Sequence, residues 1–183
     1  MKVVIIGAGV AGLGIGWRLL QAGAQVTILD RGLPAQGASW AAAGMLALIA
    51  ELQEAPAAER DLALQSSELW PGFAAELELV SGLGLGFARG GALLLSGDAA
   101  RLDGLDGRGQ VVDAAGARAL APMLAGDITD GVWVADDALV DNRALGDALT
   151  VAFLKAGATF RKGASGWGIP MVGFSANGEG GMG

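Results

Sequence analysis

Three glycines near the N-terminus have the spacing of a phosphate-binding loop. Gly7, Gly9 and Gly12 lie in the segment VVIIGAGVAG, after a β-branched run and before a helical pattern. The first glycine permits a tight turn, the second lets the backbone approach a pyrophosphate, and the third lets the helix pack closely on the strand. The helix N-terminus would then present unpaired N–H groups to the phosphates. This spacing predicts a dinucleotide site.

A carboxylate follows at the place where such a site needs one. Asp30 comes directly after a second apolar run, residues 25–29, and lies about 20 residues beyond the glycines. A carboxylate there accepts hydrogen bonds from the adenosine ribose and disfavours a 2′-phosphate, so NADP is not expected. The glycine loop by itself does not separate NAD from FAD. An NAD-dependent dehydrogenase domain therefore stays an alternative.

The uncharged stretch 3–17 has two other interpretations. A membrane-spanning helix needs about 20 apolar residues, and this stretch is shorter and contains several glycines. A secretory signal peptide is the second interpretation, because Ala22-Gly23-Ala24 resembles a cleavage site. The glycine spacing and the strand-like run that follows it favour the nucleotide fold over both.

The composition removes several classes of chemistry. The 183 residues include no Cys, His or Tyr, which excludes disulfides, thiolate catalysis, a His-based triad and Cys- or His-ligated metals. The net charge is −7 and no run of Lys or Arg occurs, so neither nucleic acid nor a membrane surface is an expected partner. Adjacent Asp136 and Asp137 are expected to be solvated, and no metal site is predicted. The lack of Cys is mildly compatible with a cytoplasmic location.

Hydrophobic periodicity predicts an α/β fold in which a parallel sheet is flanked by helices. A break is expected near Trp70, because Pro71 interrupts a long helical pattern. Strands are predicted over 2–6, 25–29, 83–87, 91–95, 131–135 and from 159, with 83–87 and 91–95 forming a hairpin. Helices are predicted over 10–22, 57–80, 99–105, 114–120 and 142–156, and 40–50 is apolar and compatible with a helix.

The residues after Asp30 resemble a known family. ILDRG is followed by PAQGASWAAAGML, and this stretch resembles the glycine oxidase branch of the D-amino-acid oxidase and sarcosine oxidase superfamily. The resemblance implies FAD as the cofactor. The family's flavin contacts can be carried over position by position. In addition to the three glycines, they fall on Val10, Ala11, Asp30, Arg31, Ala38, Ser39, Ala43, Gly44 and Met45. Without the preceding motif, the Ala-rich run would be interpreted as a buried helix.

Weaker similarities continue along the chain to about residue 160. RGGALLL and LAPMLAGDITDGVWVADDALVDNRALGDAL resemble the family, although Ala121 stands where a Glu is usual and Gly166-Trp167 is a poor match. The resemblance implies a division into a Rossmann-like FAD-binding domain, residues 1–82 and 136–165, and a partial substrate-domain insertion, residues 83–135. Residues 166–183 are Gly-rich and are expected to form an irregular tail. Family members are about twice this length, and the missing half normally supplies the arginine that grips the substrate carboxylate.

The activity implied by the resemblance is oxidation of glycine or another small amine or amino acid, in thiamine biosynthesis. Oxygen reoxidises the flavin and hydrogen peroxide is released. No catalytic side chain is identified; Arg89, Arg118 and Arg143 are candidates for a carboxylate clamp by residue type alone. A non-catalytic FAD-binding fragment is the main alternative. Unpaired sheet edges in such a fragment favour a homo-oligomer.

Overall fold

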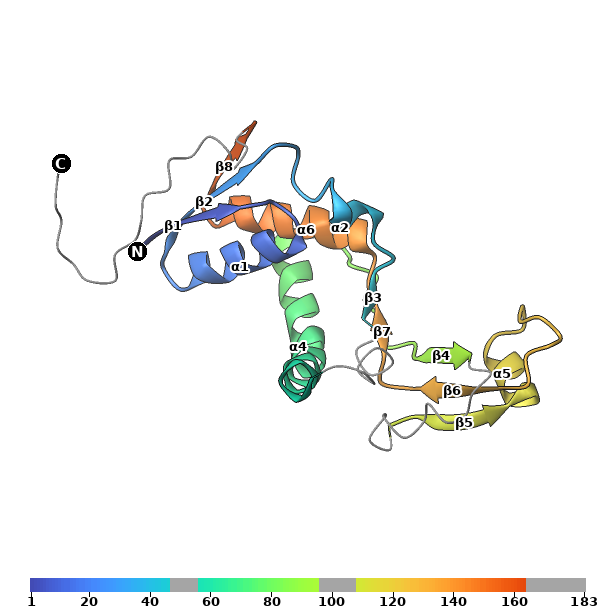
Figure 1. The fold of residues 1–183 in the computed structure, drawn as a ribbon. Helices are drawn as coiled ribbons and strands as arrows, with labels where there is room; N and C mark the ends of the chain where they lie inside the picture. The colour runs from blue at the N-terminus through green and yellow to red at the C-terminus, as the bar shows by residue number, and fades with distance from the viewer. Residues whose placement is uncertain (47–55, 96–107, 164–183) are drawn as a thin grey trace, which may run out of the picture.

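The computed structural model describes residues 1–46, 56–95 and 108–163. Two parts are visible in Figure 1, a parallel sheet with its helices and a separate antiparallel sheet. The elements that the structure describes are β1 (Lys2–Ile6), α1 (Val10–Gln21), β2 (Gln25–Asp30), α2 (Ala38–Ala41), β3 (Met45–Leu46), α4 (Ala57–Ser81), β4 (Ala92–Leu95), β5 (Gln110–Asp113), α5 (Ala114–Leu120), β6 (Asp130–Val134), β7 (Ala138–Leu139), α6 (Asn142–Lys155) and β8 (Thr159–Lys162). The predicted helix over 99–105 and the Gly-rich tail lie outside the described residues.

The parallel sheet has the strand order β1-β2-β8. β1 and β2 pair in parallel, with Val3 opposite Val26 and Ile5 opposite Ile28. Parallel neighbours need a crossover connection, and α1 supplies it. The predicted βαβ unit is therefore confirmed, and the α/β fold class with it.

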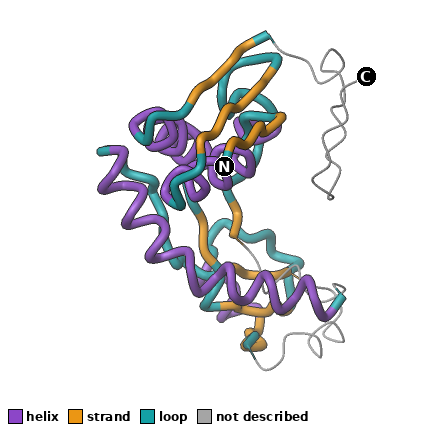
Figure 2. Tube along the Cα trace, turned by 90° about the vertical axis from the view of Figure 1, so that its left-hand side faces the viewer, coloured by secondary structure: helices purple, strands orange, loops and turns teal. Residues whose placement is uncertain are grey.

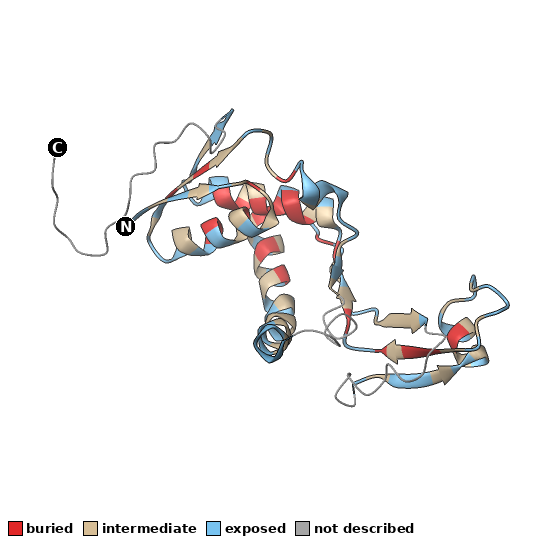
Figure 3. Ribbon diagram, in the orientation of Figure 1, coloured by how far each residue is buried: buried red, intermediate tan, exposed pale blue. Residues whose placement is uncertain are grey.

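Helices α1 and α6 lie on one face of this sheet, and part of α4 packs against α6 (Figures 1 and 3). Trp17, Leu77 and Phe153 are buried there, and a Cβ on Gly16 would lie 2.8 Å from the Phe153 ring. Gly16 thus lets α1 and α6 approach closely. On β1, Val4 and Ile6 are 61% and 63% exposed, so in the described part of the chain the opposite face of this strand stays uncovered.

Helix α4 continues through Pro71, so the predicted break is wrong. Its two halves nevertheless run in different directions (Figures 1 and 2). Proline has no N–H, which leaves the carbonyl of Ser67, one turn earlier, without its helical donor. Nη2 of Arg89 donates to that carbonyl oxygen at 3.0 Å. A donor from outside the helix therefore compensates for the missing bond.

The antiparallel sheet has the order β4-β6-β5. The predicted hairpin between 83–87 and 91–95 is wrong, because β4 pairs with β6 and 83–87 is not a strand. Leu85 is instead fully buried in the core, and its carbonyl accepts a hydrogen bond from the Asp141 amide at 2.9 Å. Strand β5 was not predicted, and α5 confirms the helix expected over 114–120.

A two-residue antiparallel ladder between β3 and β7 lies between the two parts (Figure 1). The helix-compatible run that begins at residue 40 does not form one helix as far as residue 46, since α2 ends at Ala41 and Ala42 is extended. Its remainder, 47–50, lies outside the described residues. Gly44 has φ +76°, and a Cβ there would collide with the Val140 carbonyl oxygen. This close crossing of two backbones is the physical reason that the helix does not continue.

Within the residues that the structure describes, no helix has both the length and the apolar composition to cross a membrane.

Candidate functional site

The turn from β1 into α1 has the form predicted for a phosphate loop. Gly7 adopts φ +105°, and its amide donates to the Leu29 carbonyl at 2.8 Å. Gly9 is the N-cap of α1 and contributes no side chain. A Cβ on Gly12 would collide with the Gly7 carbonyl oxygen. The glycines therefore leave bare backbone at the N-terminus of α1, where N–H groups without helical partners are available to an anion.

Asp30 ties the end of β2 to the glycine loop. Its Oδ2 accepts a hydrogen bond from the Ala8 amide at 2.7 Å, and its Oδ1 accepts one from the Gly32 amide at 2.7 Å. The Ala8 hydrogen bond is the main cause that lowers the pKa of Asp30, followed by the Gly32 hydrogen bond, and the charge of Arg31 adds to them. The carboxylate is thus held ionised. Two oxygens offer about four acceptor positions, so Asp30 retains capacity for ribose hydroxyls.

Ser39 approaches the same helix terminus from α2. Its Oγ accepts a hydrogen bond from the Val10 amide at 3.1 Å. A Cβ on Gly9 would lie 3.2 Å from this oxygen, so the glycine also provides space for the serine. The hydroxyl proton of Ser39 remains able to donate to a phosphate oxygen.

A cavity of about 330 Å³ lies between the glycine loop, the end of β2 and the segment that leads to α2. The volume falls at the lower end of the range for small-molecule sites. Its lining residues are Ala8, Gly9, Asp30, Arg31, Gly32, Leu33, Ala35, Gln36, Gly37, Ala38 and Ser39. Five of these were predicted, and the others belong mostly to the loop 31–39. The glycines and proline of that loop indicated a turn, but not which residues face the cavity.

Ala35 illustrates how tightly this loop is held. It adopts φ +56°, an unusual conformation for a residue with a side chain, and it is buried. Its amide donates to the Ala8 carbonyl at 2.7 Å. A Cβ on Gly146 of α6 would lie 2.5 Å from the Ala35 Cβ, so α6 supports the cavity wall from behind.

The remaining predicted contacts are not among the residues that line this cavity. Val10 and Ala11 begin α1, directly after the loop. Ala43, Gly44 and Met45 follow α2 and lead into β3, and Met45 is 62% exposed. The structure thus brings the glycine loop, Asp30 and Ser39 together, and residues 43–45 follow α2 along the chain.

The three arginines proposed by residue type make other contacts. The Arg89 guanidinium is bonded to the Ser67 carbonyl of α4. Arg118 donates to the carbonyls of Ala114, Gly126 and Ile128. The guanidinium carbon of Arg143 lies 4.4 Å from the centre of the Trp40 ring. None of them lines the cavity beside the glycine loop.

The expectation for the paired carboxylates is wrong in part. Asp137 is 2% exposed, whereas solvation was predicted for both carboxylates; Asp136 is exposed. Asp137 belongs to the turn between β6 and β7, where its carbonyl accepts a hydrogen bond from the Gly91 amide at 2.9 Å. The described residues contain no cluster of acids that could hold a metal ion.

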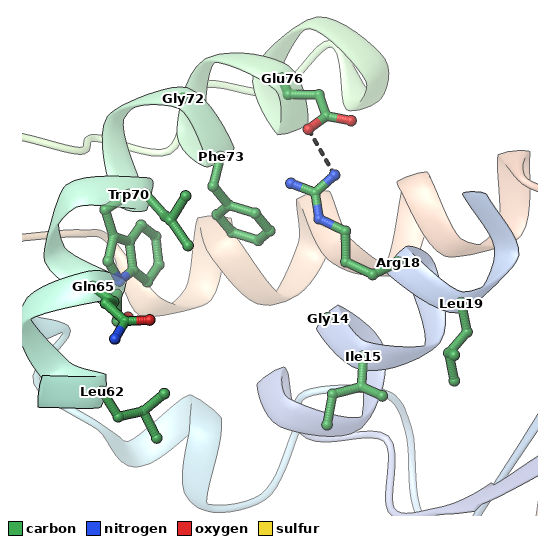
Figure 4. A pocket seen from close by; sticks show the side chains of 12 residues that line it. Gly14, Ile15, Arg18, Leu19, Leu62, Gln65, Trp70, Gly72, Phe73 and Glu76 are labelled. Atoms are coloured by element: carbon green, nitrogen blue, oxygen red, sulfur yellow. Dashed lines mark hydrogen bonds and ion pairs between the residues drawn. The ribbon is translucent and has the colours of Figure 1, made fainter. Parts of the chain in front are cut away.

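A larger groove of about 1070 Å³ separates α1 from α4 (Figure 4). Apolar side chains dominate its lining, among them Ile15, Leu62 and Phe73. Arg18 and Glu76 form an ion pair of 2.7 Å at one end of it, and the hydrogen bond from Arg18 is the main cause that lowers the pKa of Glu76. The groove lacks the bare backbone amides of the glycine loop, so the smaller cavity is the better candidate for a dinucleotide.

A parallel βαβ unit, a glycine loop at a helix N-terminus and an acid at the end of the second strand define a dinucleotide-binding protein. Residues 2–177 match the DAO family, described as FAD dependent oxidoreductases, and the chain belongs to this family. The expectation of FAD as the family's cofactor is thereby confirmed.

Individual relatives agree with this assignment. The chain is 35% identical over 157 residues to the bifunctional protein ThiO/ThiG of Trichormus variabilis, covering 82% of this chain and 24% of that protein. Over 94 residues it is 38% identical to a glycine oxidase of Geobacillus kaustophilus, covering 51% of this chain and 25% of that protein.

Solved structures share the fold. The crystal structure of glycine oxidase from Geobacillus kaustophilus matches with a TM-score of 0.80 and 31% identity, over 88% of this chain and 46% of that one. The chain thus spans about a quarter of these curated relatives and about half of this solved structure. Similarity to the glycine oxidase type, predicted from the sequence, is confirmed.

Proposed function

We propose that this chain is the FAD-binding part of an oxidase of the glycine oxidase type. The supporting observation is the meeting of three features at one helix terminus: the bare glycine loop, the ionised Asp30 and the hydroxyl of Ser39. The parent reaction would convert glycine or another small amine to an imine, with oxygen as acceptor and hydrogen peroxide as product. Residues 1–82 and 136–165 would form the cofactor domain, and 83–135 a part of the substrate domain.

Each group at the site has a defined task in this proposal. The amides at the start of α1 would stabilise the diphosphate, and Gly9 would let it approach the backbone. Gly12 would serve the site indirectly, since it lets α1 pack closely against the loop. Asp30 and Arg31 would hold the adenosine, and Ser39 would donate to a phosphate oxygen. Ala43, Gly44 and Met45 would continue toward the flavin ring. The bound flavin supplies the capacity to accept a hydride, while the chain supplies position and charge.

The second candidate is an FAD-binding chain that does not oxidise a substrate. It is favoured by the arginines, since the guanidinium groups of Arg89 and Arg118 are already engaged with backbone carbonyls. A role in thiamine biosynthesis is proposed from the ThiO/ThiG relative. A cytoplasmic location and a homo-oligomer stay predictions.

Absorbance and fluorescence titration of the purified chain with FAD and with NAD tests the proposal. We expect saturable FAD binding with flavin absorbance bands and no comparable response to NAD. A colourless protein that ignores added FAD would contradict the proposal. Hydrogen peroxide from glycine, sarcosine or D-alanine would favour the oxidase, and FAD binding without peroxide would favour the second candidate.

A further inference from the structure

One side chain of α6 holds α2 from a distant part of the sequence. The Nδ2 of Asn142 donates hydrogen bonds to the carbonyl oxygens of Ser39 at 2.7 Å and Trp40 at 3.0 Å. Because α2 has four residues, its carbonyls have no donors within their own helix. Asn142 therefore satisfies two acceptors that would otherwise depend on water.

Ser39, one of the two residues that Asn142 holds, also contacts the N-terminus of α1. The Oγ of Ser39 accepts the Val10 amide, while the carbonyl of Ser39 accepts Asn142. Fixing the carbonyl of this residue constrains where its hydroxyl lies. The neighbouring residue of α2 is held as well, because the Arg143 guanidinium lies 4.4 Å from the Trp40 ring centre. The start of α6 thus contacts α2 through two consecutive side chains.

We propose that Asn142 is a positioning residue for the cofactor. Its amide fixes the backbone of Ser39 and Trp40 and thereby holds the Ser39 hydroxyl at the N-terminus of α1. Asn142 does not line the cavity itself, so it acts through Ser39. This inference rests on the proposed FAD-binding function.

Asn142→Asp is the direct test, because it keeps the shape and replaces the donating NH₂ group by an oxygen facing two carbonyls. In a fluorescence titration of the whole chain, we expect the dissociation constant of FAD to rise by about tenfold or more. The reason is that the two carbonyls of α2 lose their donor, and a half-buried acceptor without a partner is costly. Gln65→Glu makes the same change of amide to carboxylate at an exposed position of α4. It should leave the constant unchanged within about twofold.

A double-mutant cycle with Ser39→Ala separates positioning from general support of the fold. If Asn142 acts through Ser39, Asn142→Asp should add less than about threefold once the hydroxyl is absent, because the two residues belong to one interaction. If the two substitutions raise the dissociation constant of FAD by factors that simply multiply in the double variant, the proposal is wrong. Should circular dichroism show that Asn142→Asp does not fold, Asn142→Ser takes its place in the same cycle.

Hydrogen exchange of the Val10 amide in the FAD-free protein gives a readout that is independent of the cofactor. Both Ser39→Ala and Asn142→Asp should accelerate this exchange, whereas Gln65→Glu should not. A chain that fails to bind FAD would refute the proposed function and leave this measurement intact. Unchanged exchange of Val10 in Asn142→Asp would refute the positioning role even if FAD binds.

Discussion

At the scale of single residues, the site depends on positions where a side chain is absent. A Cβ on Gly12 would meet a backbone carbonyl, which cannot move aside as the end of a side chain can. Gly14, two residues further along the same helix, has open space around its missing Cβ. Because the two glycines lie in one helix and differ in what surrounds them, a substitution at Gly14 is the matched control for the same substitution at Gly12.

Gly12→Ala should destabilise the protein by roughly 1–3 kcal/mol and abolish FAD binding, because the helix must move away from the loop. Gly14→Ala should stabilise it by roughly 0.5–1 kcal/mol, since alanine is the better helix former. Denaturant unfolding and FAD titration of both variants measure these effects. Equal behaviour of the two variants would mean that the close packing at Gly12 is unimportant.

Asp30 predicts a dependence of stability on pH. Its pKa is lowered in the folded protein below the usual 3.8, so it contributes stability above that pH. This contribution is lost as the pH falls from about 4 through the folded pKa. The stability difference between the wild-type chain and Asp30→Asn should therefore shrink between pH 7 and pH 3, as measured by urea unfolding. Asp147→Asn, which removes one carboxylate at an exposed position of α6, is the matched control for the loss of charge.

At the scale of elements, α4 tolerates an internal proline because a residue outside the helix replaces the lost donor. Arg89→Met removes that donor and should cost about 1 kcal/mol. In a Pro71→Ala background the residue at 71 regains an N–H for the Ser67 carbonyl, so the cost of Arg89→Met should fall. A double-mutant cycle by chemical denaturation measures the difference. Strictly additive effects would show that Arg89 and Pro71 are not linked.

The elements also show what could be predicted from sequence. The βαβ unit was predictable because its strands, turn and helix are adjacent in the chain and each has a local signal. The pairing of β4 with β6 was not predictable, because β6 is distant in the chain. The apolar run nearest to β4 contains Leu85, which is buried in the core and does not belong to a strand. The contact of Asn142 with Ser39 spans 103 residues and leaves no local pattern. Local signals thus located the glycine loop and Asp30, whereas the supports behind them required the structure.

At the scale of the whole molecule, the uncovered face of β1 leads us to predict that the chain self-associates through this face. Val4 and Ile6 both lie on this face and are more than half exposed. Val4→Thr with Ile6→Thr keeps residues that favour strands and removes apolar surface. Sedimentation velocity should show self-association weakened by roughly tenfold or more, because each buried apolar side chain contributes about 1.5–3 kcal/mol. Leu79→Thr, a change at a still more exposed position on α4, should have little effect. A chain that is monomeric from the start would contradict the prediction.

The backbone amides of Ala8 and Gly32 orient the Asp30 carboxylate through hydrogen bonds within the chain itself. A receptor that is already arranged loses little conformational freedom when its ligand arrives. Stopped-flow mixing with FAD should therefore give a single fast phase whose rate rises linearly with cofactor concentration, with no slow rearrangement following the encounter.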